Sequence, residues 1–191
     1  MPRAGANLER IRGLLSGGDR RSIADSNRVR AMVEDEPSLV RELVALTSDL
    51  DWLVAQRALD LLEKLAHDHI DWVTPHKRVF LGPPARSDKW EIRLQVVRAL
   101  PLFDWARRQL QQVEQILIES VRSPQTFVRA WALDGLSRLL DRRPSLRTVV
   151  QRHVRAFERS SSKALQARAR HIRARLERDL RSRPAPRARA L

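Results

Sequence analysis

Apolar residues recur along most of the chain at spacings of three and four, which is the period of an amphipathic α-helix. The segment 146–157 illustrates the pattern, since its apolar positions share one side while Arg152 and Arg155 fall on the other. No alternating segment bounded by hairpin turns is present, which argues against a β-sheet. Breaks containing Pro or Gly separate the helical segments, because proline fits the first turn of a helix but not its interior. The pattern therefore predicts an all-α fold.

Three of these helices share one apolar pattern, in which an apolar residue is followed by three spacers, a small-apolar pair, two spacers and a leucine. The matching anchors are Val54/Ala58/Leu59/Leu62, Ile92/Val96/Val97/Leu100 and Val128/Ala132/Leu133/Leu136. The helices begin at Trp52, Trp90 and Thr126, so their starts are 38 and 36 residues apart. A thinner stripe continues the period through Leu165, Ala169, Ile172 and Leu176. Each period also holds a second helix, expected over 37–47, 73–80, 106–121 and 144–159. A helix pair that recurs at this period indicates a stacked helical repeat.

A helix pair of this length, in which Val128-Arg129 precedes Ala132-Leu133 and Leu136, resembles the HEAT/armadillo-type repeat. The stretch 50–140 is also similar to small bacterial HEAT-repeat proteins, in ALDLLEKL at 58–65, TPHK at 74–77 and RALP at 98–101. The resemblance covers 35–160 and implies an α-solenoid, a superhelix of about four to five HEAT-like helix pairs. It does not imply a function, because function depends on sites and not on the fold.

The expected organisation has three parts. Residues 1–18 form a partly flexible N-terminal segment, and 19–180 form the solenoid with a basic C-terminal capping helix. Residues 181–191, RSRPAPRARAL, have no apolar stripe and are expected to be a disordered Arg/Pro tail.

The composition excludes several kinds of chemistry. The 191 residues include no Cys and no Tyr, so disulfides, thiolate nucleophiles, Cys-ligated zinc and Fe–S clusters are absent. No Gly-rich phosphate loop or nucleophile motif is present. No apolar run approaches the roughly 18 residues that cross a bilayer, and the N-terminus lacks the apolar stretch of a signal peptide. We expect a cytoplasmic protein that is not an enzyme and has no cofactor, membrane contact or small-molecule substrate.

The net charge of +14 is concentrated near the C-terminus. Residues 1–75 carry 10 Lys/Arg and 13 Asp/Glu, whereas residues 142–191 carry 16 and 3. Only four of the 37 basic residues are Lys. Arginine forms bidentate contacts with phosphate and carboxylate, although a GC-rich genome also produces Arg-rich, Lys-poor chains. In the last predicted helix, 162–180, the arginines are expected to surround the stripe from Leu165 to Leu180 and to give the cap a cationic outer face.

The predicted partner- or anion-binding residues are Lys77, Arg78, Arg152, Arg155, Arg159, Arg168, Arg173 and Arg175. The residues expected to be exposed on the second helices are mixed: Arg41 and Glu42, then Lys77 and Arg78, then Gln111, Gln115 and Glu119, then the arginines of 144–159. A groove that follows a nucleic-acid backbone needs cations along its length. The mixture therefore favours a scaffold that binds a protein partner with an acidic portion. The alternative is sequence-independent nucleic-acid binding through the Arg-rich C-terminal helices and tail.

Two other groups of residues are candidates for chemistry. His67, Asp71 and His76 could ligate a metal, but they also fit polar residues at a helix end and turn, and no metal site is predicted. Trp131 and Asp134, three apart on one helix, loosely resemble a pair used by HEAT-like DNA glycosylases of alkylation repair, which gives a minor enzymatic alternative. The other tryptophans argue against it, since Trp52 and Trp90 occupy the same repeat position, as packing residues do.

Overall fold

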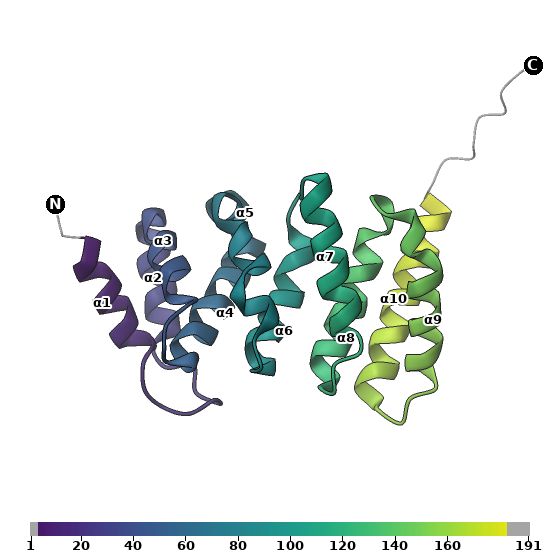
Figure 1. Ribbon diagram of the computed structural model, residues 1–191, viewed down its shortest axis with the longest axis horizontal. Coiled ribbons are helices and arrows are strands. Elements are labelled where there is room, and N and C mark those ends of the chain that lie inside the picture. Colours follow the sequence, from purple (N-terminus) through teal and green to yellow (C-terminus); the bar gives the residue numbers. More distant parts are fainter. Residues whose placement is uncertain (1–3, 183–191) are drawn as a thin grey trace, which may run out of the picture. The chain divides into compact units, whose positions relative to one another are not determined.

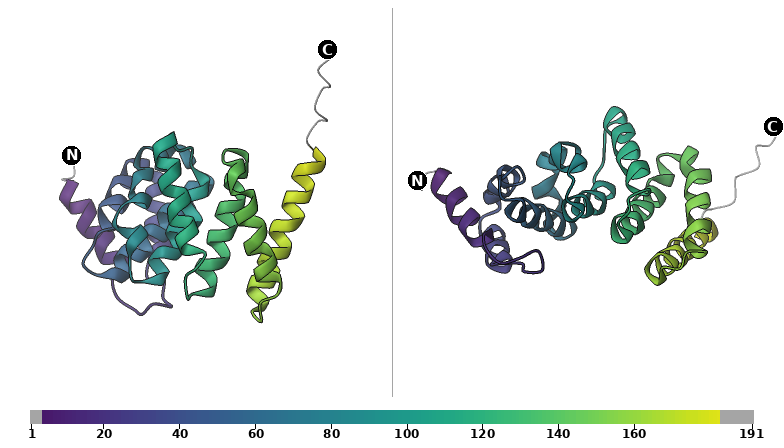
Figure 2. Two further views of the ribbon diagram at one scale, coloured as in Figure 1. Left: turned by 45° about the vertical axis from the view of Figure 1, so that its right-hand side comes forward. Right: turned by 60° about the horizontal axis from the view of Figure 1, so that its bottom comes forward.

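The computed structural model describes residues 4–182 and the side chains of residues 5–179 and 181. Over this range the backbone forms ten α-helices joined by short 3-10 turns and contains no β-strand (Figure 1, Figure 2). The all-α prediction is confirmed. The helices are α1 Ala4–Leu15, α2 Ser26–Asp35, α3 Val40–Leu46, α4 Trp52–Asp68, α5 Ile70–Val73, α6 Trp90–Ala99, α7 Arg107–Ser120, α8 Thr126–Arg138, α9 Arg147–Glu158 and α10 Lys163–Ser182. None of the helices in the described range has a stretch long and apolar enough to cross a membrane.

The 3-10 turns occur mostly where the sequence contains proline. They cover Pro37–Leu39, Thr74–Leu81, Pro83–Arg86, Leu100–Leu102, Leu139–Asp141 and Pro144–Leu146. Proline has no N–H to donate and is accepted in the first turn of a helix, so α3 and α9 are each preceded directly by such a turn. The segment predicted as a helix over 73–80 is for this reason the short α5 followed by a long 3-10 stretch.

The chain divides into two compact units, the first ending at Ile116 and the second beginning at Leu117, within α7. In the first unit α1 packs on α2, α3 and α4, and α4 packs on α3, α5 and α6. In the second unit α8, α9 and α10 all contact one another, and α9 and α10 lie side by side (Figure 2). Within each unit, therefore, helices that follow one another in the sequence pack as pairs, as the repeat predicts.

The repeat anchors form the core of both units. All twelve anchors of the three matching helices are buried, from Val54 in α4 to Leu136 in α8, and so are Leu165, Ala169 and Ile172 in α10. Residues spaced by four, five and eight positions lie on one face of a helix, which explains why the pattern marked them correctly. Leu176 is the exception, because it is only half-buried.

Truncating an anchor should destabilise the protein. Leu100 and Leu133 are fully buried, so replacing either with alanine removes three buried carbon atoms and leaves a cavity between packed helices. We expect Leu100→Ala and Leu133→Ala each to lower the free energy of unfolding by at least about 2 kcal/mol, as measured by urea denaturation. Leu50→Ala is the matched control, since Leu50 is fully exposed. Equal midpoints for all three variants and the parent protein would contradict the assigned repeat register.

Both ends of the helical region differ from the boundaries predicted for the solenoid. Residues 4–15, expected to be part of a flexible segment, form helix α1, whose Ile11 and Leu15 are fully buried. Arg12 ties α1 to the turn after α3, with its Nε 2.7 Å from Asp49 Oδ2, and this hydrogen bond lowers the pKa of Asp49. At the other end α10 continues to Ser182. The rest of the predicted Arg/Pro tail, 183–191, lies outside the described residues.

The connection between α1 and α2 is held by a buried arginine. Arg57 of α4 is 2% exposed, and its guanidinium donates hydrogen bonds to four backbone carbonyls. These belong to Leu15 at 2.6 Å, Gly17 at 2.8 Å, Asp19 at 3.0 Å and Ser22 at 3.1 Å. Gly18 adopts a φ of 68°, and a Cβ at this position would lie 2.9 Å from the Ser22 side chain. The conformation of this connection thus requires a glycine at position 18 and the hydrogen bonds that Arg57 donates.

One residue expected to be exposed is buried. Glu42 on α3 is only 6% exposed, and Arg41 Nε donates to its Oε1 at 3.1 Å. The prediction was wrong because α3 contacts α1 on one side and α4 on another, so its buried arc is wider than a single amphipathic stripe.

Candidate anion-binding face

Helix α9 separates an apolar side from an arginine-bearing side. Val150, Val154 and Phe157 are buried in the second unit. Arg152, Arg155 and Arg159 are exposed, and since they are three and four positions apart they share one side of the helix. We call these three residues the α9 arginine face. Together with Thr148, Gln151 and Ala156 they line a shallow depression.

The α9 arginine face is not neutralised by the described part of its own chain. Within residues 4–182 none of its three arginines, nor Arg147 one turn before them, forms an ion pair with a carboxylate. Residues 117–182 carry 16 Lys/Arg against 6 Asp/Glu. These arginines therefore contribute a positive potential that an anionic ligand can neutralise.

His153, on the same helix, is half-buried and lies close to three of the positive charges of this unit. Burial lowers its pKa, and the nearby charges of Arg122, Arg152 and Arg129 lower it further. Positive neighbours disfavour the imidazolium form, so His153 is neutral at pH 7. The positive charges around α9 thus disfavour a further positive charge there, and for the same reason they favour a bound anion.

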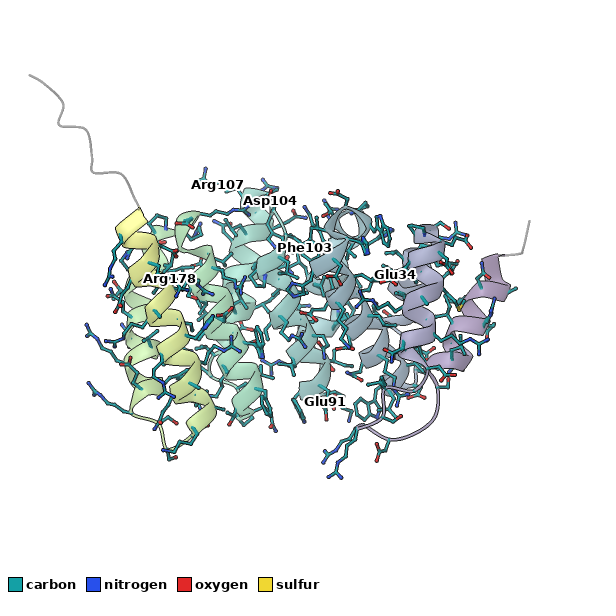
Figure 3. All side chains as sticks on the ribbon, turned by 180° about the vertical axis from the view of Figure 1, so that it is seen from behind. Glu34, Glu91, Phe103, Asp104, Arg107 and Arg178 are labelled. Atoms are coloured by element: carbon teal, nitrogen blue, oxygen red, sulfur yellow. The ribbon has the colours of Figure 1, made fainter. Side chains whose placement is uncertain are left out.

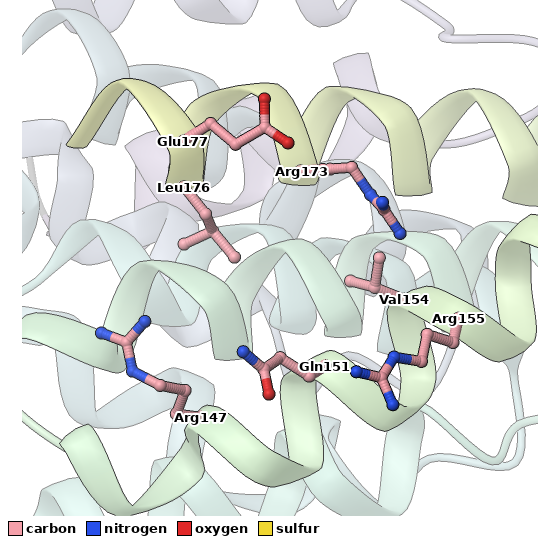
Figure 4. A pocket seen from close by; sticks show the side chains of 7 residues that line it. All are labelled: Arg147, Gln151, Val154, Arg155, Arg173, Leu176 and Glu177. Carbon is pink, nitrogen blue, oxygen red and sulfur yellow. The ribbon is translucent and has the colours of Figure 1, made fainter. Parts of the chain in front are cut away.

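A groove of about 260 Å³ lies beside this face, between α9 and α10 (Figure 4). We call it the α9–α10 groove; its lining residues are Arg147, Gln151, Val154, Arg155, Arg173, Leu176 and Glu177. Val154 and Leu176 extend into it from opposite helices and give it an apolar floor (Figure 4). Arg155 and Arg173 stand at one end of the groove and Arg147 at the other, while Glu177 extends from α10 between them (Figure 4). Arg173 is exposed, and its Nη2 is 2.6 Å from Glu158 Oε2.

Two of the arginines predicted to bind a partner instead face the interior of the second unit. The carboxylate of Asp134 on α8 is 1% exposed, and its Oδ1 is 3.2 Å from Arg175 Nη1 and 3.6 Å from Arg168 Nη1. Arg138 completes the cluster from α8 itself, with its Nε 2.8 Å from Oδ2. We call these four residues the Asp134 cluster. The expectation of a cationic outer face was therefore wrong for Arg168 and Arg175, because a buried carboxylate on α8 attracts them inward.

Further contacts fix both arginines in place. Arg175 also donates a hydrogen bond to the hydroxyl of Ser137. The guanidinium carbon of Arg168 lies 4.0 Å from the centre of the Trp131 ring, which is a close cation–π contact. Arg178, one turn further along α10 than Arg175, remains exposed on the surface (Figure 3).

Asp134 is held in its ionised form. Burial alone would raise its pKa, but the hydrogen bond from Arg138 and the charges of Arg175, Arg138 and Arg168 outweigh burial and lower it. The carboxylate accepts from guanidinium groups on two helices and is almost completely enclosed. Contact with an extruded base would require these ion pairs to break, so the pair Trp131 and Asp134 is arranged here as a packing and charge-pairing unit.

Lys77 and Arg78 belong to the first unit and have separate surroundings. Lys77 Nζ donates to the backbone carbonyl of Asp104, which lies just before α7 (Figure 3), and is 5.4 Å from the Trp105 ring centre. Its ammonium group is thus held by its own chain. Arg78 is exposed and lines a shallow depression with Leu81, Ala106, Arg108, Gln109 and Gln112.

The histidines near the end of α4 make contacts with neighbouring side chains. His67 Nε2 is 2.9 Å from Oε1 of the buried Glu63, and the His69 ring stacks on Trp72 at a centroid distance of 3.9 Å. Among the residues that the structure describes, no group of three or more His, Cys, Asp or Glu side chains could hold a metal ion.

The α9–α10 groove was not predicted from the sequence. Gln151 is four residues after Arg147 and four before Arg155, so a helical wheel of α9 could have placed all three on one side. Leu176, Arg173 and Glu177 come from α10, and only tertiary packing brings them to α9.

Comparison with known proteins gives a fold but no family. No protein-family model matches the sequence, and no curated protein matches it. Among solved structures the chain is similar to two engineered proteins of the Northeast Structural Genomics Consortium, targets OR366 and OR329. The first has a TM-score of 0.60 at 15% identity over 90% of this chain and 81% of that chain. The second has a TM-score of 0.54 at 15% identity over 87% of this chain and 77% of that chain. This likeness establishes the class, an all-α fold of helices packed in consecutive pairs as in engineered helical repeat proteins.

Proposed function

We propose that this chain is a non-enzymatic interaction scaffold that binds an acidic segment of a partner protein on the α9 arginine face. One observation supports the proposal most directly: three exposed arginines share one side of α9 and have no carboxylate partner within the described residues. Arginine side chains that are not paired within the chain can form bidentate contacts with carboxylates of another chain. The apolar floor of the adjacent groove gives a polypeptide additional area to bury.

We also assign the repeat to the HEAT/armadillo type as part of this proposal. The support is the burial of the anchors at the predicted period, together with the pairing of consecutive helices. Base excision is outside the proposal, because Asp134 is enclosed by arginines. The cytoplasmic location stays a prediction.

Neutralising the α9 arginine face should weaken binding to an acidic polypeptide. We expect the triple variant Arg152→Gln, Arg155→Gln, Arg159→Gln to bind fluorescein-labelled poly-glutamate at least about tenfold more weakly than the parent chain at low salt. Its thermal unfolding should change little, since the three side chains are exposed. Fluorescence anisotropy measures the first expectation and circular dichroism the second.

A charge-matched control separates a local site from a general effect of net charge. Arg20, Arg21 and Arg86 are exposed residues of the first unit, and replacing all three with glutamine removes the same charge. We expect this control variant to retain nearly the affinity of the parent chain. Equal weakening of both triple variants would show that net charge, and not the α9 arginine face, determines binding.

Sequence-independent nucleic-acid binding is the second candidate, because the same three arginines could pair with phosphates. It predicts that affinity for single-stranded DNA falls steeply with salt, in proportion to the number of phosphates contacted. The mixed surface elsewhere favours the protein partner: the exposed positions of α7 carry two cations, two amides and an acid, namely Arg107, Arg108, Gln111, Gln115 and Glu119. Co-purification from the native host with and without nuclease distinguishes the two, since a nucleic-acid complex is lost on digestion and an acidic protein is retained.

A further inference from the structure

We infer that the α9–α10 groove recognises an aliphatic side chain flanked by carboxylates, so that the ligand of this protein is an amphipathic acidic helix. The inference rests on the proposed function and specifies the chemistry of the partner. Its starting point is the pairing of an apolar floor with arginines at both ends of one groove (Figure 4).

The apolar floor contains Leu176, an anchor position whose equivalents are buried in the other repeats. Leu176 is the last anchor of its repeat, and the equivalent leucines, Leu62, Leu100 and Leu136, are all fully buried. In α10 this anchor is half-buried, and Val154 beside it is 5% exposed. A branched aliphatic side chain placed over Leu176 would give it the apolar contact that its equivalents have.

The charges at the groove select the occupant. Arg147 and Arg155 form no ion pair within the described residues, and Arg173 shares one with Glu158. Glu177 lines the α10 side of the groove, across from Arg147 on α9, and Arg155 has no carboxylate partner among the described residues, so a ligand carboxylate belongs near Arg155 (Figure 4). The chain's own C-terminal sequence is not a suitable occupant, because residues 183–191 contain three arginines and no acid.

A helix satisfies these requirements better than an extended segment. Residues three or four apart on a helix face the same way, so a leucine and a glutamate one turn apart can reach the floor and the arginine end together. A nucleic acid offers phosphates but no aliphatic side chain. Its bases stack on exposed aromatic rings, and the groove lining contains none.

The test compares two helix-forming peptides of equal charge on the full chain. Both contain Ala and Glu; one carries two leucines four positions apart, and the other carries serines there. By fluorescence anisotropy, we expect the parent chain to bind the leucine peptide about tenfold more tightly, the gain from burying an aliphatic side chain. Leu176→Gln should remove this preference while retaining the affinity for the serine peptide. The control Arg170→Gln, exposed on α10 outside the groove, should leave the preference unchanged.

A second variant keeps the test valid if Leu176→Gln disturbs folding. Gln151 is exposed and lines the groove, so Gln151→Trp fills the groove without changing the core and should also abolish the leucine preference. Equal affinity of the parent chain for both peptides would overturn the inference and leave the proposed function standing. Binding of neither peptide at low salt would overturn both. If Gln151→Trp keeps the leucine preference, recognition lies elsewhere and the inference is wrong. The inference is also wrong if Gln151→Trp weakens the binding of single-stranded DNA as much as it weakens the binding of the leucine peptide.

Discussion

Replacing Asp134 with asparagine is expected to lower the free energy of unfolding by about 4 kcal/mol, the largest effect of any single substitution proposed for this chain. The neutral amide fills the same space but leaves Arg138, Arg168 and Arg175 close together with no carboxylate between them. Arg168 and Arg175 are mostly buried, so water screens their mutual repulsion poorly. Equilibrium unfolding in urea measures the difference between the variant and the parent chain.

The arginine side of the cluster provides the control. Arg138 is 44% exposed and is one of three cations around one carboxylate, so Arg138→Gln should cost less than about 1 kcal/mol. The two substitutions should therefore differ in their effect on the free energy of unfolding. Removing Asp134 breaks all three ion pairs of the cluster, whereas removing Arg138 breaks only one. Equal costs for the two substitutions would show that Asp134 acts through packing and not through its charge.

The same cluster should make the protein sensitive to acid. The folded-state pKa of Asp134 is lowered, so the unfolded chain binds a proton more readily than the folded chain. The stabilisation is therefore complete above the unfolded pKa of about 4 and is lost as the pH falls through the lower, folded value. The stability difference between the parent chain and Asp134→Asn should be constant from pH 7 to about pH 5 and should shrink below about pH 4. A difference that stays constant down to pH 2 would contradict this assignment.

Arg57→Met is expected to lower the free energy of unfolding by about 3 kcal/mol. The methionine retains the apolar part of the side chain but donates no hydrogen bond, so four carbonyls of the α1–α2 connection lose the Arg57 donor, and only the Asp19 carbonyl keeps a hydrogen bond from another backbone N–H, that of Ser22. One of them, the Leu15 carbonyl, makes its hydrogen bond in a buried setting at 2.6 Å. Because the lost contacts all fix residues 15–22, the damage should begin there.

Limited proteolysis and hydrogen exchange would locate this effect. In Arg57→Met we expect cleavage between α1 and α2 and faster exchange in α1, before α4 loses protection. Arg57→Lys is the matched variant, since it keeps the charge but cannot reach four carbonyls from one ammonium group; its stability should lie between the other two. A lysine variant as stable as the parent chain would show that charge alone suffices and that the four-way hydrogen bonding is unimportant.

The core of the fold could be predicted from the sequence because it depends on local periodicity. The anchors of α4, α6 and α8 recur at the same spacing, and all of them are buried. The start of the last helix pair was also predictable, since Pro144 marks a first helical turn. Predictions of exposure were less successful: Glu42 is buried because α3 has neighbours on two sides, and a helical wheel represents only one helix at a time.

The candidate site was predictable only in part. Arg152, Arg155 and Arg159 lie on the exposed side of α9 as the pattern predicts, whereas Arg168 and Arg175 turn inward toward Asp134. The difference depends on one carboxylate 34 residues before Arg168 in the sequence. A charge count shows an excess of arginine but does not show which of the arginines are already paired.

The sequence by itself determined that this chain is all-α, where its repeated helices lie and which side chains form the core, because helix formation and burial follow from spacing along one helix. Only the tertiary structure decided which cations remain exposed, that Arg57 holds a distant loop and that α9 and α10 enclose a groove. Those features depend on pairs of residues far apart in the sequence, and the period of a helix carries no information about them.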